Sequence, residues 1–372
     1  MKAIIEKDVF MRALSHVQSV VERRNTIPIL SNILLVCEGS TLTVVATDLE
    51  LEIKETLEAQ VTTAGGLTAS AQRLHDIVSK LPDGAQLELS QETGSDELQL
   101  FSGTSVFLLQ TLPQDDFPQM KQDKSSTAFS LQAQDLSRLL RKAQFAISTE
   151  ETRYYLNGVY LHICEEEGAD LLRAVATDGH RLAQLQMVRP EGAADMPPII
   201  VPRKTVGEVL KVLDDKEDEV SISISDVQIV FTMPHITLMS KLVDGKYPDY
   251  KRVIPVGNDK ILSVDAKAFT QCVERVSAVS GEKTRAVKLN LQDDKLKLSV
   301  SSPTSGNAND EISVAYKGKA LEVGFNGQYL TDITKQIDGT TAVFEMGDST
   351  SPTLIRDEED GDALYVLMPM RV

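Results

Sequence analysis

Tryptophan is absent from this 372-residue sequence, and aromatic residues make up only 5% of it. Proteins that bind single-stranded nucleic acid without sequence preference usually stack the bases on aromatic side chains. A stacking surface of that kind is therefore not expected. The apolar fraction of 42% and the charged fraction of 25% are otherwise those of an ordinary globular protein.

Cysteine is scarce as well, with only Cys37, Cys164 and Cys272. Residues so far apart supply neither a metal-ligand cluster nor an even-numbered disulfide framework. We expect them to be reduced, partly buried small residues.

Histidine and catalytic motifs are also sparse. The five histidines are His16, His75, His162, His180 and His235, and no two of them have the spacing of a pair of metal ligands. The sequence contains no G-x-S-x-G elbow, no H-E-x-x-H, no phosphate-binding loop and no G-x-G-x-x-G. Neither a metal nor a cofactor is predicted.

Long hydrophobic runs are missing too. Glu6, Lys7 and Asp8 interrupt the N-terminal segment before an apolar stretch of signal-peptide length accumulates. No run approaches the roughly 18 residues that a membrane-spanning helix needs. We therefore expect a cytoplasmic protein without a membrane partner.

Positive charge is in deficit, because 38 Lys and Arg face 55 Asp and Glu and the formal net charge is -17. Binding to phosphates relies on Lys and Arg and on the release of counterions. A protein that coats nucleic acid indiscriminately is thus excluded. Any contact with DNA must be confined to a local basic surface.

The chain is too long for one ordinary hydrophobic core, so two or three domains are expected. Internal similarity supports three. Ala46-Thr47-Asp48 recurs as Ala176-Thr177-Asp178, and Leu112 with Phe117-Pro118 recurs as Leu242 with Tyr247-Pro248. Both pairs are separated by 130 residues, which indicates a repeated structural unit.

Each repeat shows the same order of predicted elements. An amphipathic helix opened by a capping Asp is predicted over 8–21, 135–147 and 265–279. A strand pair with a polar turn follows, then a second helix within 71–84, 202–215 and 326–339, and finally another hairpin. The sequence therefore predicts an α+β protein of three domains, 1–125, 126–258 and 259–372, each with two helices packed on antiparallel sheets.

The predicted helices carry basic residues. In the middle repeat, Leu136, Leu139, Leu140 and Ala143 recur at helical spacing, which leaves the other face basic. That face holds Arg138, Arg141 and Lys142, and further basic residues on or near helices are Arg23, Arg24, Arg73, Lys80, Arg203, Lys204, Lys211, Lys267 and Arg275. Single Lys and Arg residues on solvated helices often have no function. Basic faces on equivalent helices of an acidic chain nevertheless favour a surface that lines DNA.

Several longer segments add a resemblance to a known family. They are Thr26-Ile27-Pro28-Ile29-Leu30, Arg153-Tyr154-Tyr155-Leu156-Asn157-Gly158, Ala176-Thr177-Asp178-Gly179-His180-Arg181-Leu182, Lys241-Leu242-Val243-Asp244-Gly245-Lys246-Tyr247-Pro248-Asp249-Tyr250 and Met368-Pro369-Met370-Arg371. With these segments in this order, the chain resembles the β subunit of bacterial DNA polymerase III. The resemblance covers essentially the whole chain.

The resemblance implies a DNA sliding clamp without catalytic residues of its own. Three domains of the DNA clamp type per chain would form a head-to-tail homodimeric ring, with helices lining the hole and sheets forming the rim. A heterologous interface can close in this way when its rotation returns to the start. The ring would encircle double-stranded DNA of any sequence, tether the replicative DNA polymerase and other replication and repair proteins, and be opened by a clamp loader.

The resemblance also assigns residues to DNA contact. It links the positions of Arg24, Arg73, Tyr154 and Tyr155 with DNA. Together with Arg138, Arg141, Lys142, Arg203 and Lys204, they form the predicted DNA-binding set. We expect weak binding without sequence preference, because contacts to phosphates carry no base information.

A peptide pocket between the second and third domains is implied as well. Its matching positions are Leu156, Thr177, Gly179, His180, Arg181, Leu182, Pro248, Arg252, Val253, Asn326, Tyr329, Val366, Leu367, Met368, Pro369, Met370 and Arg371. Apolar side chains with two Met make an adaptable surface, and Arg and Asn can hydrogen-bond an extended peptide. The alternative is that the terminal segment is only a buried final strand. Thr284 stands where some members of the family carry an aromatic residue.

The interface that closes the ring is assigned in the same manner. Phe107 and Leu109 of the first domain are expected to face Ala278 and Val279 of the third domain of another copy. The alternative is that these apolar residues complete the core of their own domains.

Two other functions fit parts of the sequence. His180, beside Asp178 and Arg181, suggests a hydrolase, since a carboxylate can orient an imidazole as a general base. However, the counterpart of Asp178 is Asp48, which no His follows, so a turn-forming role explains both copies. An acidic scaffold that does not bind DNA is the second alternative.

Overall fold

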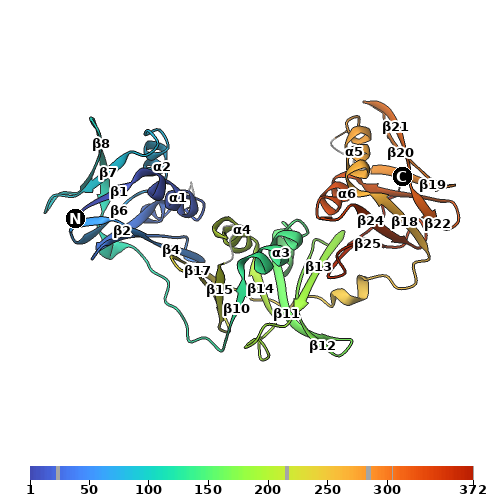
Figure 1. Ribbon diagram of the computed structural model, residues 1–372, viewed down its shortest axis with the longest axis horizontal. Coiled ribbons are helices and arrows are strands. Elements are labelled where there is room, and N and C mark those ends of the chain that lie inside the picture. The colour runs from blue at the N-terminus through green and yellow to red at the C-terminus, as the bar shows by residue number, and fades with distance from the viewer. Residues whose placement is uncertain (22–25, 214–217, 282–285, 304, 372) are drawn as a thin grey trace. The chain divides into compact units, whose positions relative to one another are not determined.

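The computed structural model describes residues 1–21, 26–213, 218–281, 286–303 and 305–371 (Figure 1). Three of the residues discussed above, Arg23, Arg24 and Thr284, lie outside these ranges. The chain forms two compact units. Unit 1 comprises Met1–Ser137, Pro190–Pro197 and Lys204–Leu242, and unit 2 comprises Arg138–Arg189, Pro198–Arg203 and Val243–Val372.

The first repeat contains two α-helices among its strands. Its elements are β1 (Lys2–Glu6), α1 (Lys7–Gln18), β2 (Asn32–Glu38), β3 (Thr41–Thr47), β4 (Leu51–Glu58), β5 (Gln60–Thr63), β6 (Gly65–Ser70), α2 (Ala71–Val78), β7 (Gln86–Ser90), β8 (Glu97–Ser102) and β9 (Ser105–Leu112). Short 3₁₀ helices, η1 (Pro28–Ser31) and η2 (Gln114–Asp116), lie in its connections.

The middle repeat has the same order. Its elements are β10 (Thr127–Gln132), α3 (Ala133–Gln144), η3 (Glu151–Leu156), β11 (Gly158–Glu166), β12 (Ala169–Thr177), β13 (Arg181–Val188), β14 (Ile199–Pro202), α4 (Arg203–Val212), β15 (Glu219–Ile224), β16 (Gln228–Thr232), β17 (Ile236–Lys241) and η4 (Tyr250–Val253).

The third repeat again follows this order. Its elements are β18 (Lys260–Asp265), α5 (Ala266–Ser277), β19 (Ala286–Gln292), β20 (Lys295–Ser302), β21 (Gly306–Ser313), β22 (Ala315–Lys317), β23 (Leu321–Asn326), α6 (Gly327–Thr334), β24 (Thr341–Met346), β25 (Thr353–Asp357) and β26 (Ala363–Leu367). The predicted α+β fold, with two helices and antiparallel strands in each repeat, is confirmed.

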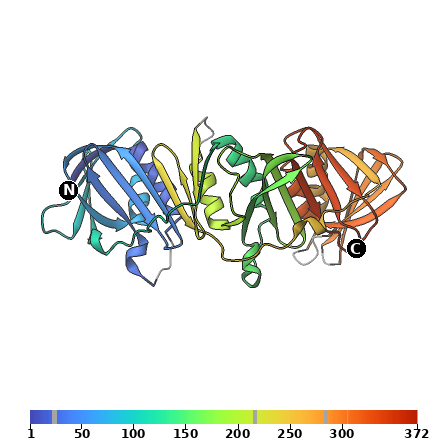
Figure 2. The same ribbon diagram turned by 90° about the horizontal axis from the view of Figure 1, so that it is seen from below.

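Sheets continue from one repeat into the next within each unit (Figures 1 and 2). In unit 1, β17 of the middle repeat pairs antiparallel with β4 of the first, with Leu238 opposite Ile53. In unit 2, β26 of the third repeat pairs antiparallel with β13 of the middle one, with Tyr365 opposite Ala183. Each compact unit therefore joins one terminal repeat to half of the middle repeat.

The helices bury their apolar stripes, and α1, α2, α5 and α6 pack against strands of their own repeats. In α3, Leu136, Leu139, Leu140 and Ala143 are at most 1% exposed, as the spacing predicted. Phe10 of α1 and Phe269 of α5 are fully buried. Full burial of one such side chain contributes about 1.5–3 kcal/mol of hydrophobic free energy, so the helices are held mainly by their sheets.

The predicted Asp caps are confirmed at only one helix. The Asp265 carboxylate accepts a hydrogen bond from Ala268 N at the start of α5. Asp8 and Asp135 instead lie inside the first turns of α1 and α3. An acidic residue within the first turn still interacts favourably with the helix dipole, which explains why the sequence pattern resembles that of a cap.

The three cysteines are free thiols, as predicted, and Cys37 and Cys272 are buried while Cys164 is partly buried. Burial raises the pKa of Cys37 to about 11 and that of Cys272 to about 12. Both thiols therefore stay protonated at neutral pH and behave as small core residues. Among the described residues, no helix combines the length and apolar character that crossing a membrane requires.

Candidate functional site

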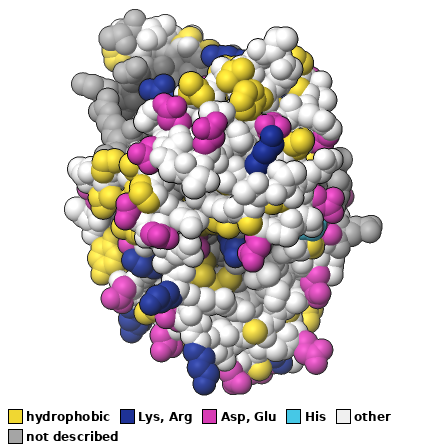
Figure 3. Space-filling view, turned by 90° about the vertical axis from the view of Figure 1, so that its left-hand side faces the viewer, with side chains coloured by type: hydrophobic (Ala, Val, Ile, Leu, Met, Phe, Trp, Pro, Cys, Tyr) yellow, Lys and Arg dark blue, Asp and Glu magenta, His cyan; other side chains and the backbone are white. Residues whose placement is uncertain are grey.

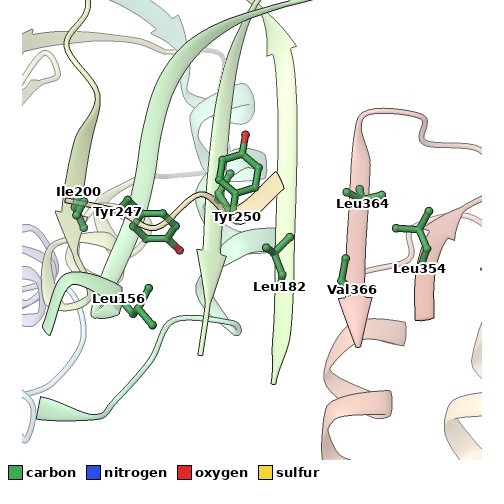
Figure 4. Close-up of a cluster of buried hydrophobic side chains, with 9 residues drawn as sticks. Leu156, Leu182, Ile200, Tyr247, Tyr250, Leu354, Leu364 and Val366 are labelled. Carbon is green, nitrogen blue, oxygen red and sulfur yellow. The ribbon is translucent and has the colours of Figure 1, made fainter. Parts of the chain in front are cut away.

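The junction between the middle and third repeats carries a cluster of apolar side chains (Figure 4). Because β13 and β26 are adjacent, Leu182 lies opposite Val366. Leu156 from the end of η3 packs into the same cluster, together with Val175, Ile200, Tyr247, Tyr250, Leu354 and Leu364. The structure thus brings together Leu156, Leu182 and Val366, three of the residues predicted to form the peptide pocket.

The last residues of the chain border this cluster. Met368 N–H donates to His180 O at 2.9 Å, and Met370 N–H donates to Gly324 O at 2.8 Å. These bonds hold the terminal segment against both repeats while the two Met side chains stay 37% and 40% exposed. Val253 is also exposed, at 45%. The segment is therefore more than a buried final strand, since it presents apolar side chains to solvent beside a buried apolar floor.

Three other predicted pocket residues lie close to α6. Asn326 caps this helix and accepts a hydrogen bond from Gln328 N, whereas the rings of His180 and Tyr329 stack with centroids 6.4 Å apart. The predicted residues not yet placed are the buried Thr177 and Leu367, the partly buried Pro369, and the exposed Gly179, Pro248, Arg252 and Arg371.

Arg181 has a structural role at this junction. Its guanidinium donates to Asp178, to Asp332 on α6 and to Phe145 O, and its side chain is only 11% exposed. The guanidinium carbon also lies 4.2 Å from the centroid of the Tyr329 ring. Through these three hydrogen bonds Arg181 clamps the middle repeat to the third. Its assignment to the peptide pocket stays a prediction.

The junction between the first and middle repeats has a corresponding side-chain bridge, formed by a lysine instead of an arginine. Lys204 Nζ, on α4, donates to Asp48 Oδ2 at 2.5 Å and to Val20 O at 2.9 Å. In both junctions a cation bridges the Asp of the repeated Ala-Thr-Asp turn and a carbonyl that follows the first helix of the repeat. Such a cation also complements the negative end of the helix dipole.

Asp178 and Asp48 form the same turn. Asp178 Oδ1 accepts from His180 N and Arg181 N, and Asp48 Oδ1 accepts from Glu50 N and Leu51 N. The predicted turn-forming role is confirmed. The Asp178 carboxylate bonds backbone N–H groups and Arg181, so no Asp–His pair of the hydrolase type is present at this turn.

An aromatic and polar network supports the segment that carries Pro248 and Val253. Tyr160 stacks on Tyr247 and on His162, with ring centroids 4.6 Å and 4.7 Å apart. His162 Nε2 bonds Tyr250 OH at 3.0 Å, and Arg173 Nη1 donates to the same hydroxyl at 3.4 Å. Sequence patterns did not identify this network, because it joins side chains of β11 and β12 to the segment that follows β17, which is distant in the sequence.

The predicted DNA-binding residues are not all exposed. Lys142 is only 6% exposed and pairs with Asp338 at 2.6 Å and with Asp360 at 3.2 Å. Arg138 Nη2 donates to both carboxylate oxygens of the same Asp360. The expectation that these residues share one solvent-facing surface with Arg141 is therefore wrong for Lys142. Helical spacing did not predict this, because the acidic partners come from loops of the third repeat.

The other predicted DNA contacts are more accessible. Arg73, Arg141 and Arg203 are exposed, Lys204 is half-buried in its clamp, and Tyr154 is 53% exposed. The Tyr155 ring meets that of Tyr154 edge-on, with centroids 5.7 Å apart.

The residues predicted to close a ring lie on β9 and just after α5. Phe107 is partly buried, Leu109 is 8% exposed, Ala278 is exposed and Val279 is partly buried. Sequence reasoning missed Val106 and Leu108, which are 55% and 58% exposed. Along the side that Figure 3 shows, hydrophobic side chains are interspersed with acidic and basic ones.

Comparison with known proteins gives consistent matches along the chain. Residues 1–121, 130–249 and 251–371 match the N-terminal, central and C-terminal domains of the DNA polymerase III beta subunit. The beta sliding clamp of Caulobacter vibrioides is 48% identical over 372 residues, which is all of both chains. That of Pseudomonas putida is 38% identical over 369 residues, or 99% of each chain.

Solved structures agree. The DnaN sliding clamp of Bartonella birtlesii bound to griselimycin has a TM-score of 0.96 at 46% identity, with complete coverage of both chains. The clamp of Pseudomonas aeruginosa bound to griselimycin has a TM-score of 0.93 at 37% identity, again with complete coverage.

The buried His162 makes stability depend on pH. Burial lowers the pKa of His162, so the folded protein keeps this imidazole neutral below about pH 6.5, where the unfolded chain takes up a proton. The free energy of unfolding of the native protein should therefore decrease, relative to that of the variant His162→Gln, as the pH falls from 8 to 5. Chemical denaturation at several pH values measures this difference.

Tyr250→Phe is the control, because it removes the hydroxyl that bonds His162 and Arg173 but leaves His162 buried, so the dependence on pH should persist. A difference between the native protein and His162→Gln that stays constant from pH 8 to pH 5 would contradict the assignment.

Proposed function

Because the chain belongs to the DNA polymerase III beta subunit family and is a DNA sliding clamp, not an enzyme, we propose that two copies close head to tail into a ring around duplex DNA. The domains of this ring are residues 1–125, 126–258 and 259–372. A clamp loader opens it in the cytoplasm, and polymerase and repair proteins dock through short peptides at the junction between the second and third domains.

The observation that carries the ring proposal is the identical pairing at the two junctions inside the chain. In each, the last strand of one repeat pairs with the strand that follows the Ala-Thr-Asp turn of the preceding repeat. The corresponding last strand of the first repeat is β9, and the strand of the third repeat that corresponds to β4 and β13 is β21. Among the described residues, β21 pairs only with β20, and residues 105–110 of β9 pair only with β8.

The register between β9 of one copy and β21 of another follows from the two strand pairs inside the chain, β17 with β4 and β26 with β13. Phe107 lies opposite Leu100 on β8, as Leu238 and Tyr365 lie opposite Phe231 and Ile355. Leu238 and Tyr365 are paired in turn with Ile53 and Ala183. On β21, the counterpart of Ile53 and Ala183 is Ala308. Ala308 lies opposite Val300 on β20, in the same way that Ala183 lies opposite Ala176 on β12. Phe107 of one copy would therefore face Ala308 of the other.

An aromatic contact at the junction between the middle and third repeats supports the same alignment. Tyr365 contacts Phe145 just after α3, with ring centroids 5.9 Å apart. The residue in the corresponding place after α5 is Ala278. Phe107 of one copy would thus approach Ala278 of the other, the pair that the family resemblance implies. Heterologous pairing of this kind closes when its rotation returns to the start.

The exposed apolar side chain of Leu108 on β9 also supports an interface with a second copy. Leu108 is 58% exposed, whereas Met239, at the corresponding place on β17, is 8% exposed. Open strand edges with apolar side chains are prone to pair with another chain. Pairing with β21 of a second copy would cover both the backbone groups and Leu108.

The DNA-facing surface is proposed to consist of helix residues that are not neutralised. Arg73, Lys80, Arg203 and Lys267 are exposed and form no ion pair with any residue in the described ranges. Arg141, Tyr154 and Tyr155 complete the proposed surface, and Arg24 belongs to it by the family resemblance. Lys142, Arg138 and Lys204 contribute less, since carboxylates already compensate their charges.

Retention on DNA should depend on topology. Once a clamp loader has placed it, the protein should stay on nicked circular duplex in a gel-filtration assay and dissociate after the circle is cut. Replacement of Arg73, Lys80, Arg203 and Lys267 by Gln should weaken binding to open duplexes and reduce its salt dependence, by roughly 0.9 in the log–log slope for each phosphate that the protein no longer neutralises. Lys317→Gln with Lys319→Gln, outside the helices, is the control for charge. Equal retention on circular and linear DNA would refute the ring.

Dimer formation should depend on the open edge of β9. The variant Leu108→Asp places a charge where β21 of a second copy would cover it, so its dissociation constant should rise roughly 100-fold, equivalent to about 2.7 kcal/mol. Analytical ultracentrifugation measures the constant. Val227→Asp, at a 56% exposed site in the turn before β16, should leave it unchanged. A Leu108→Asp protein that dimerises as tightly as the native one would contradict the pairing.

Peptide docking is proposed at the apolar floor and its exposed rim. Met368→Glu should weaken binding of an extended peptide with one Gln and two large apolar residues by about 1–3 kcal/mol, because it introduces a charge into an apolar contact. Calorimetric titration of the full-length protein tests this. Val188→Glu, at a site 73% exposed and outside the predicted pocket, is the matched control. Equal effects of the two variants would rule out the proposed surface.

A further inference from the structure

Unit 1 has an open cavity of about 640 Å³ on the face of its sheet, where the first and middle repeats meet. Its lining includes Leu34 of β2, Val45 of β3, Glu52 of β4, Met239 of β17 and Met120 from the segment after β9. A volume of this size is within the usual range for sites that bind small molecules or side chains. None of these residues belongs to the proposed peptide pocket or to the helices that would face DNA.

In unit 2 the corresponding space is filled by aromatic rings. Leu34 lies opposite Val45, just as Tyr160 lies opposite Val175. By the same alignment, Val36 corresponds to His162. The 130-residue offset that relates Phe117-Pro118 to Tyr247-Pro248 makes Met120 the counterpart of Tyr250. Tyr160, His162 and Tyr250 pack together there, with a hydrogen bond of 3.0 Å between the last two. Unit 1 thus leaves open the space that three rings occupy in unit 2.

The two faces also differ in their charged residues, because Glu38, Glu52 and Lys54 line the cavity of unit 1. Glu52 occupies the place of Leu182, is only 8% exposed, and lines the cavity. Its Oε2 accepts a hydrogen bond from Met120 N at 2.8 Å. Lys54 also lines the cavity, but no cation lies within ion-pair distance of the Glu52 carboxylate in the described part of the chain. Burial raises the pKa of Glu52, although the hydrogen bond from Met120 N and the charge of Lys54 oppose the rise. A buried carboxylate in this state gains from a cation that enters the cavity.

We infer that this cavity binds an aromatic side chain next to a basic one, presented by an extended segment of a partner protein. The ring would occupy the space that Tyr160 and Tyr250 fill in unit 2, and the ammonium or guanidinium group would pair with Glu52. Met120, Met233 and Met239 line the cavity and can adapt to the shape of the ring, because Met side chains are flexible and polarizable. The repeat itself therefore indicates the chemistry of the ligand.

The test measures the contributions of the aromatic ring and of the positive charge to binding separately. Tyramine carries both groups, p-cresol only the ring, and n-butylamine only the ammonium. Each is titrated into the full-length protein with ¹³C-labelled Met methyl groups and followed by NMR. Tyramine should shift the Met120 and Met239 signals and bind roughly tenfold more tightly than p-cresol, since one ion pair of about 1.4 kcal/mol corresponds to that factor. n-Butylamine should bind more weakly still.

Variants locate the two contacts. Glu52→Gln keeps a hydrogen-bond acceptor for Met120 N, so it should remove the advantage of tyramine over p-cresol while p-cresol binds as before. Glu58→Gln, on the exposed part of β4, is the control and should change neither affinity. Lowering the pH until Glu52 is protonated should weaken the binding of tyramine but not that of p-cresol.

Filling the cavity provides the second test. Leu34→Tyr introduces the ring found at the corresponding position of unit 2 and should abolish binding of both aromatic probes. Met120→Tyr changes a less buried residue, so it keeps the test valid if Leu34→Tyr does not fold. The inference is overturned if tyramine and p-cresol bind equally to the native protein, if their shifts occur only at Met368 and Met370, or if a folded filled variant still binds both.

Discussion

Antiparallel pairing of strands across the repeat boundaries is the constraint on which the other features depend. Leu238 pairs with Ile53 at one boundary and Tyr365 pairs with Ala183 at the other, so the two joins use corresponding residues. A shift by one residue would turn every side chain to the opposite face of the sheet, and both faces here are largely buried. The pairing therefore fixes which residues meet at each junction, including Leu182 and Val366.

Side-chain clamps reinforce this pairing, and they show how a repeated architecture accepts different residues. The cation is Lys204 on a helix at the first junction and Arg181 at the start of a strand at the second, yet both reach the Asp of the Ala-Thr-Asp turn. Arg181 forms several bonds with one planar group, whereas the ammonium of Lys204 acts as a point charge. Arg181, for which the sequence predicted a peptide contact, thus also supports the surface beside it.

The sequence predicted the repeats, the two helices of each repeat, the buried stripe of α3 and the turn at Asp178. These features depend on local patterns, namely apolar spacing, turn residues and internal identity. It did not predict the burial of Lys142, because Asp338 and Asp360 approach it from loops roughly 200 residues further along the chain. Nor did it predict the ring network of Tyr160, His162 and Tyr250, or the open edge at Leu108, since both depend on the order of strands in a sheet.

Within the described residues, the open part of β9 and the open edge of β21 lie on different strands, and this separation affects mixed populations. In a ring closed by these edges, a chain with damage at only one edge still has an intact edge at the other. Such a chain would pair with an undamaged copy and hold it in an assembly with a permanent gap. A lesion of this kind would act dominantly over the normal gene product, whereas a lesion that prevents folding would only reduce the number of usable copies.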